Sequence, residues 1–354
     1  MKHSSQIENY CNCFVCILCT RVYAKNMEDL VRVASLSITC LESLRDSARE
    51  CFDRAVPETT RNAYQADWRH FSTFCEGIGV CPLQETPKLA AELVALFVAS
   101  MAERRMATAT IRRRAAGVGK VYRDAGLPSP TLHETVKRAI KGAVRLQAEK
   151  GLRPRPARGL RPGEVRAMLA TCDPYTNKGK RDAAALALAY VCFSRRSEIP
   201  PLNLDDLTIN DEGAAVLIAR QKNRADPMTK YVPRGGQPCP VSLFERWREV
   251  SARVNAGPLF LQVDRHDNPL PTRLSLTGYD ALFARARKKA GLSADRVTTH
   301  SMRRGGAQQA ARNGYDLTAV QEHGGWKSIQ QVSEYARSGL AFDTSAACGL
   351  LDQE

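Results

Sequence analysis

The sequence predicts a mainly α-helical protein of two domains, with a small β-sheet in the second domain. Apolar residues recur at helical spacing over most of the 354 residues. Strand-like runs are confined to two short neighbouring segments, residues 214–219 and 230–233. A basic, Pro-rich stretch at residues 151–163 interrupts the helical pattern, because Pro cannot continue a helix. A chain of this length can form a core in each domain.

The expected order begins with a partly disordered N-terminal extension, residues 1–54, and a helical domain, residues 55–150. A linker, residues 151–163, and a second domain, residues 164–354, follow. Periodicity predicts the helices of the first half at residues 27–54, 57–71, 88–103, 108–125 and 131–149. It predicts those of the second at residues 162–169, 181–193, 241–253 and 272–291.

Charge points to a polyanionic partner. The chain has 52 Lys and Arg against 37 Asp and Glu, which gives a net charge of +15. Nucleic acid is the commonest partner of so basic a protein, although a merely basic protein is the alternative. One predicted helix carries Arg112, Arg113, Arg114 and Lys120 beside apolar residues. This face is either solvated or, as we favour, in contact with phosphates.

Cysteine usage favours a reducing compartment without disulfides. Four of the twelve cysteines crowd the N-terminus at Cys11, Cys13, Cys16 and Cys19, but no second Cys or His pair follows them at zinc-finger spacing. Zinc binding is therefore a weak alternative, and no acidic cluster of metal-binding type occurs elsewhere. We expect neither a metal nor another cofactor. No run of 18 apolar residues predicts a membrane span.

The strongest motif lies near the end of the chain. His300 and Arg303 stand three residues apart, so their side chains share one face of a helix that begins here. Trp326 and Tyr335 follow, nine residues apart. A cation, an imidazole, an indole N–H and a phenol together suit one task. They can hold a phosphodiester while an oxygen nucleophile attacks its phosphorus.

This motif resembles the C-terminal active-site box of the tyrosine recombinases, the family of phage and plasmid integrases and resolvases. Trp326, where most members carry His, resembles the Cre subgroup. Upstream, Arg195 and Glu198 resemble the family's Arg-x-x-Glu pair, with the adjacent Arg196 as competitor. Residues 217–222 resemble the strand and hairpin that deliver a Lys into the minor groove, which would be Lys222.

The resemblance implies a helical, SAM-like core-binding domain followed by a tyrosine recombinase catalytic domain. It implies double-stranded DNA with recombination sites as the partner, and a homotetramer on two duplexes, linked by a terminal helix after Tyr335. The protein would belong to a mobile element and act inside the cell on DNA. That place would be the bacterial cytoplasm, or the nucleus in a eukaryote.

The implied activity is site-specific cutting and rejoining of DNA without ATP or metal. Arg195 and Arg303 would neutralise the phosphate, with Glu198 in support. His300 would accept the phenol proton or hydrogen-bond the phosphate, and Trp326 would donate its N–H to a phosphoryl oxygen. Lys222 would protonate the leaving 5′ oxygen. Tyr335 would form a covalent bond to the 3′ phosphate.

Two other functions remain open on the sequence. A type IB topoisomerase uses a similar Arg, Lys, Arg, His and Tyr set, but Trp326 and the tail after Tyr335 argue against it. A catalytically silent DNA-binding relative would not need the Tyr nucleophile.

Overall fold

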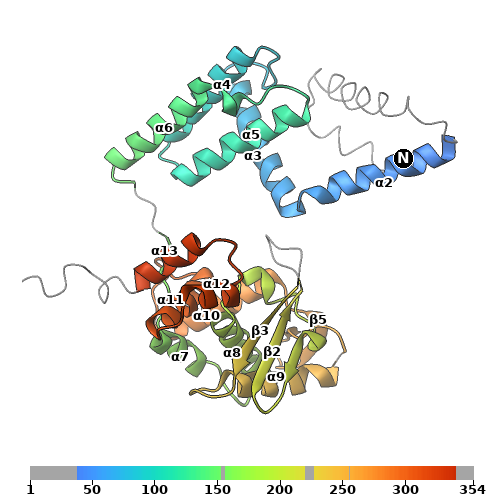
Figure 1. The fold of residues 1–354 in the computed structure, drawn as a ribbon, viewed down its shortest axis with the longest axis vertical. Helices are drawn as coiled ribbons and strands as arrows, with labels where there is room; N and C mark the ends of the chain where they lie inside the picture. Colours follow the sequence, from blue (N-terminus) through green and yellow to red (C-terminus); the bar gives the residue numbers. More distant parts are fainter. Residues whose placement is uncertain (1–37, 153–155, 220–226, 255, 340–354) are drawn as a thin grey trace, which may run out of the picture. The chain divides into compact units, whose positions relative to one another are not determined.

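The computed structural model describes residues 38–152, 156–219, 227–254 and 256–339, and the chain divides into two units between Pro154 and Arg155 (Figure 1). The predicted fold class, mainly helical with a small sheet in the second half, is confirmed. The N-terminal Cys cluster and the tail after Gly339, where an oligomerisation helix is expected, lie outside the described residues.

The first unit is built from helices around one apolar core. Its helices are α2 (Ile38–Ala55), α3 (Glu58–Gly77), α4 (Pro87–Glu103), α5 (Thr108–Asp124) and α6 (Glu134–Glu149), with a 3-10 turn, η3 (Pro130–Leu132). Helix α3 packs on α5 and α4 packs on α6. Trp68 and Phe71 are buried in this core, where Phe71 contacts Phe97 edge to face. Core packing of these two aromatics is confirmed, and Tyr64 is half-buried.

The second unit surrounds a buried Ala- and Leu-rich helix, α8 (Asn177–Val191). Its remaining helices are α7 (Pro162–Ala170), α9 (Pro240–Val254), α10 (Leu276–Lys289), α11 (His300–Arg312), α12 (Leu317–Gly324) and α13 (Ile329–Gly339). Two 3-10 turns, η4 (Arg196–Glu198) and η5 (Leu204–Asp206), follow α8. Helix α11 contacts α8 and α13, and α13 also contacts α12. Helix α11 carries His300 and Arg303, α13 carries Tyr335, and Trp326 follows the end of α12.

Two small antiparallel sheets complete the second unit. The first has the order β1 (Leu207–Ile209), β2 (Gly213–Ile218) and β3 (Met228–Pro233), and the second pairs β4 (Leu261–Val263) with β5 (Pro269–Arg273). Strand β3 alternates between exposed and buried side chains, so Lys230 and Val232 face the core. Lys230 lies opposite Val216 of β2. A charged side chain therefore stands in the apolar face of a sheet.

Three sequence expectations need correction. The helix predicted at 272–291 begins only at Leu276, because Arg273 pairs with Leu261 in a ladder and Ser275 caps the helix by accepting from the Gly278 amide. The helix predicted from residue 131 begins at Glu134, after η3, with His133 as its cap. Strands β1, β4 and β5 were missed. Strands β1 and β4 have only three residues each, which is too short an alternation to recognise, and β5 contains two prolines.

Residues just after the division between the units pack within the second unit. The Arg158 amide donates to the Arg296 carbonyl, and the Leu160 amide donates to the Ser301 carbonyl. Leu160 is buried, and a Cβ on Gly305 would lie 2.2 Å from its carbonyl oxygen. This segment therefore lies directly against the beginning of α11, the helix that carries His300 and Arg303.

Candidate active site

Arg195 lies on a tight turn at the carboxyl end of α8. The helix ends at Val191, and Phe193 adopts a positive φ of 45°, which is rare for a bulky residue. The Arg195 amide donates to Glu198 Oε2 at 2.8 Å, and its Nη1 donates to Oε1 at 2.6 Å. Arg196 instead pairs with Asp280 on α10. The two neighbouring arginines thus point to different partners, and only Arg195 is fixed to the buried Glu198.

Arg303 is buried inside the second unit. It is 1% exposed, and its Nη1 donates to the Phe193 carbonyl. Its Nη2 is buried, with no hydrogen-bond partner among the described residues. Burial, together with the positive charge of Arg195, lowers the pKa of Arg303 to about 10. A buried cation with an open donor beside a second cation is suited to receiving an anion.

A pair of glycines places Trp326 on Arg303. Gly325 ends α12 in the left-handed conformation with φ 66°, which costs glycine little because it lacks a Cβ. A Cβ on Gly324 would lie 1.5 Å from the indole, so only glycine leaves room for the ring. The Arg303 guanidinium then lies 3.9 Å from the ring centroid of Trp326. Within the described residues, no hydrogen bond of the indole N–H is found.

Tyr335, on α13, lies beside His300, on α11. The Tyr335 Oη and the His300 Nε2 are 3.2 Å apart, and the Trp326 ring is 5.6 Å from the Tyr335 ring. Partial burial of the imidazole, with the charges of Arg303, Arg304 and Arg195, lowers the pKa of His300. The lowered pKa favours the neutral ring, which can accept a proton at Nε2 in the Nδ1–H tautomer.

Two lysines are candidates for a role at this site, and the structure describes only the second of them. Lys222 falls in residues 220–226, outside the described residues. Lys230, on β3, is 1% exposed and donates from Nζ to the Cys192 carbonyl. Burial, with smaller contributions from Arg303 and Arg195 and against the opposing effects of Cys192 and Glu198, lowers its pKa to about 8. Sequence reasoning passed over Lys230, although its buried register in β3 was a usable signal.

His323 is a second residue that sequence reasoning missed. It lies on α12, and its Nε2 is 2.7 Å from the Val191 carbonyl oxygen. Its ring meets the Phe193 ring edge to face, with centroids 4.6 Å apart. Burial lowers its pKa. The signal available was its place three residues before Trp326 in a chain with only six histidines.

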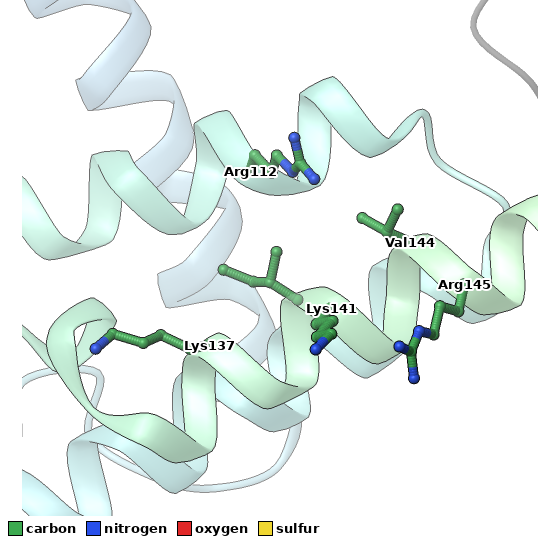
Figure 2. A pocket seen from close by; sticks show the side chains of 6 residues that line it. Arg112, Lys137, Lys141, Val144 and Arg145 are labelled. Carbon is green, nitrogen blue, oxygen red and sulfur yellow. The ribbon is translucent and has the colours of Figure 1, made fainter.

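The four predicted DNA-binding residues of α5 do not form one free cationic face. Arg113 pairs with the fully buried Asp67 at 2.6 Å, and Lys120 pairs with Asp124. Arg114 donates from Nη1 to the sulfur of Met106. Only Arg112, among the four, lines a groove of about 450 Å³ in the first unit, which Figure 2 shows.

This groove is cationic and lies between α5 and α6. Its lining is Arg112, Lys137, Ile140, Lys141, Val144 and Arg145. The four basic side chains form no ion pair that is found among the described residues. Sequence reasoning placed the cations on α5 alone, because the three consecutive arginines hid the one-turn spacing of Lys137, Lys141 and Arg145 on α6.

The described residues lack two further features. No group of three or more His, Cys, Asp or Glu side chains that could hold a metal ion occurs among them. None of the described helices is long and apolar enough to span a membrane.

Comparison with known proteins identifies the family of the chain. A model of the phage integrase family matches residues 158–340. The chain is 25% identical to an integrase/recombinase XerD homolog of Selenomonas ruminantium, over 94% of this chain and 97% of that protein. It is 25% identical to the recombinase Cre of Escherichia phage P1, over 70% of this chain and 76% of that protein.

A solved structure agrees in fold. The XerH site-specific recombinase bound to its palindromic difH substrate superposes with a TM-score of 0.56 at 15% identity, covering 82% of this chain and 80% of that one. The family model alone covers more than half of the sequence. The chain belongs to the phage integrase family of tyrosine recombinases.

Proposed function

We propose that the protein is a site-specific DNA recombinase that cuts and rejoins DNA through a covalent bond between Tyr335 and a 3′ phosphate. One observation carries the proposal most directly. The Tyr335 hydroxyl lies 3.2 Å from the His300 imidazole, beside the buried Arg303 whose Nη2 has no partner among the described residues. A nucleophile, its base and an open cationic donor thus share one site.

The two arginines would bind the scissile phosphate. Arg303 offers its free Nη2, and Arg195 is held by Glu198 while 22% of its side chain remains exposed. Guanidinium groups keep their charge and fit two phosphate oxygens at once, which a lysine cannot do. The Trp326 ring supports Arg303 from one side, and its N–H is available for a phosphoryl oxygen.

The reaction then needs two proton movements. As the Tyr335 oxygen forms its bond to phosphorus, the phenol proton moves to the His300 Nε2. The bond from phosphorus to the 5′ oxygen breaks, and that oxygen takes a proton from a general acid. Lys222 remains the candidate for this acid. Attack of another 5′ hydroxyl on the phosphotyrosine reverses the steps, so the bond energy is kept and no ATP is required.

Double-stranded DNA is the proposed partner of both units. The groove of Arg112, Lys137, Lys141 and Arg145 offers four positive charges to the phosphate backbone. Recombination needs four active sites on two duplexes, so we propose a homotetramer. The subunits of this tetramer would be linked by the terminal helix after Tyr335, and truncation after Gly339 tests that link. Recombination at the full rate by the shortened chain would contradict it.

A suicide substrate tests the activity. Duplexes that the protein binds are selected from a random pool and nicked near the cleavage point, so that the leaving fragment diffuses away. A denaturing gel should show a covalent adduct on a 3′ end, and mass spectrometry should find it on the peptide with Tyr335. Tyr335→Phe should abolish the adduct while DNA binding persists. Tyr315→Phe is the matched control, because Tyr315 is 63% exposed and lies outside the site.

The alternatives give other outcomes. DNA binding without an adduct from the unaltered protein would identify a silent DNA-binding relative. Relaxation of supercoiled plasmids without recombination of paired sites would identify a topoisomerase. An adduct that survives Tyr335→Phe would move the nucleophile to another residue.

A further inference from the structure

Three successive carbonyl groups at the end of α8 each meet a basic side chain from a different element. The Val191 carbonyl meets His323 of α12, the Cys192 carbonyl meets Lys230 of β3, and the Phe193 carbonyl meets Arg303 of α11. The last carbonyls of a helix lack partners within the helix and carry its negative partial charge. Cationic donors are therefore the groups that suit this end of α8.

The three contacts hold the turn from which Arg195 projects. Residues 191–193 lead directly into it, and Phe193 has the unfavourable φ of 45°. Backbone in this region persists only where the surroundings fix it. A Cβ on Gly306 of α11 would lie 2.5 Å from the Tyr190 carbonyl oxygen, so α11 also closes tightly on the same turn.

Lys230 is engaged with the backbone and does not face solvent. Its side chain is 1% exposed, and its Nζ already donates to the Cys192 carbonyl. Keeping a lysine in the apolar face of a sheet costs free energy unless the amine has a partner. The amine lies close enough to Arg303, Arg195 and Glu198 for their charges to act on it. These facts favour a structural role beside the phosphate site over direct contact with DNA.

We propose that Lys230 and His323 are positioning residues for the cleavage reaction, acting through the carbonyls of Cys192 and Val191 to hold the turn that aims Arg195. The inference rests on the proposed DNA cleavage. Both residues should affect the rate of the chemical step without affecting DNA affinity. Misplacing a phosphate-binding group by about 1 Å can cost about a hundredfold in rate.

The first test replaces Lys230. Single-turnover cleavage of the suicide duplex is measured at saturating protein, and DNA affinity is measured separately. Lys230→Met keeps the length of the side chain and removes the donor, so cleavage should slow about tenfold to a hundredfold at unchanged affinity. Lys230→Arg keeps a donor and should recover most of the rate. Lys288→Met, at an exposed position of α10, is the control. Cleavage by Lys230→Met at the full rate would overturn the proposal.

A substrate with sulfur in place of the 5′ bridging oxygen separates positioning from proton donation. A sulfur leaving group needs no proton, so a lost general acid is rescued and a misplaced Arg195 is not. Lys230→Met should therefore stay slow on this substrate. Rescue would make Lys230 the acid itself and would overturn the positioning role.

The third arm asks whether the effect passes through Arg195. In an Arg195→Ala background, Lys230→Met should add little further loss, because the group that it positions is gone. A full, multiplicative loss would refute the proposed route. His323→Leu tests the neighbouring carbonyl independently, with His323→Gln as the rescuing variant, so a failure of Lys230→Met to fold leaves a second test. If His323→Leu cleaves normally, its part of the proposal is wrong.

The same experiments distinguish a failure of the positioning role from a failure of the proposed function. An unaltered protein that forms no adduct would remove both proposals. An unaltered protein that cleaves, with variants equal to it, removes only the positioning role.

Discussion

Gly306→Ala tests the close approach of α11 to the end of α8. An ideal Cβ at this position would lie 2.4 Å from Cδ1 of Phe193 and 2.5 Å from the Tyr190 carbonyl oxygen. Both distances are well below ordinary van der Waals contact. The Phe193 ring is buried, and the carbonyl belongs to the backbone of α8, so neither can move without moving the turn that leads to Arg195.

The expected cost follows from two opposing effects. Overpacking a filled site typically costs about 1–3 kcal/mol, and an obstructing backbone atom favours the upper part of that range. Alanine gains up to about 1 kcal/mol over glycine in a helix interior. The net effect of Gly306→Ala should be a loss of about 1–2 kcal/mol in the unfolding free energy of the second unit. Cleavage should slow as well, because α11 carries both His300 and Arg303.

Unfolding of the second unit can be followed by itself. The chain has three Trp residues, and in a Trp68→Phe background the remaining two, Trp247 and Trp326, both lie in the second unit. Urea unfolding followed by their fluorescence then reports that unit.

Gly163→Ala in α7 is the matched control for this measurement. A Cβ at Gly163 would meet only an Arg166 side-chain nitrogen, at 3.9 Å, so this variant should be neutral or slightly stabilising. Equal or greater stability of Gly306→Ala would refute the close packing of α11 on α8.

Three further predictions concern charge. The pKa of Lys230 is lowered from 10.5 to about 8 by folding, which corresponds to a loss of about 3 kcal/mol in unfolding free energy while the lysine is protonated in both states. Between pH 8 and 10.5, Lys230 is protonated in the unfolded protein and deprotonated in the folded protein, so the stability rises with pH. The unfolding free energy of the unaltered protein minus that of Lys230→Met should therefore rise by about that amount from pH 7.5 to 10.5, whereas a constant difference would contradict the burial of the amine. Arg195→Ala should slow cleavage about a hundredfold and Arg196→Ala should not, as single-turnover rates will show, and the reverse result would move the catalytic role to Arg196. Replacing Arg112 and Lys141 with Ala should lower the salt dependence of DNA affinity by about two counterions, whereas an unchanged slope would exclude the groove from the DNA contact.

Local pattern was enough to predict much of the fold and part of the geometry of the candidate site. Helical periodicity located the main helices of both units because each buries one apolar face. The spacing of His300 and Arg303 predicted a shared helix face, and both do lie on α11. The relation of His300 to Tyr335 needed the tertiary structure, because the two residues meet only where α13 packs against α11.

The contacts that sequence reasoning missed are long-range. The local sequence predicts Lys230 as an exposed lysine of a strand, but the register of the sheet places its side chain on the core side. The local sequence shows His323 only as a polar residue of a short helix, and its contact with the Val191 carbonyl depends on α12 packing at the end of α8. The local sequence does not distinguish Arg113 from its two neighbouring arginines, but in the structure Arg113 forms an ion pair with the buried Asp67 of α3. In each case the partner lies more than 30 residues away in the chain, where local periodicity carries no information.

The same contacts explain how the second unit tolerates so many buried positive charges. Arg303 and Lys230 are each 1% exposed, and Arg195 stands beside them. The carboxylate whose charge acts on Lys230 and Arg303 is that of Glu198, which is already hydrogen-bonded to Arg195. The carbonyls at the end of α8 supply part of the missing negative charge, since a helix carries a negative partial charge at its carboxyl end. They leave the Arg303 Nη2 unsatisfied and the pKa of Arg303 lowered. A phosphate between Arg195 and Arg303 would supply the remaining charge, so binding of the scissile phosphate should relieve a cost that the folded protein otherwise bears.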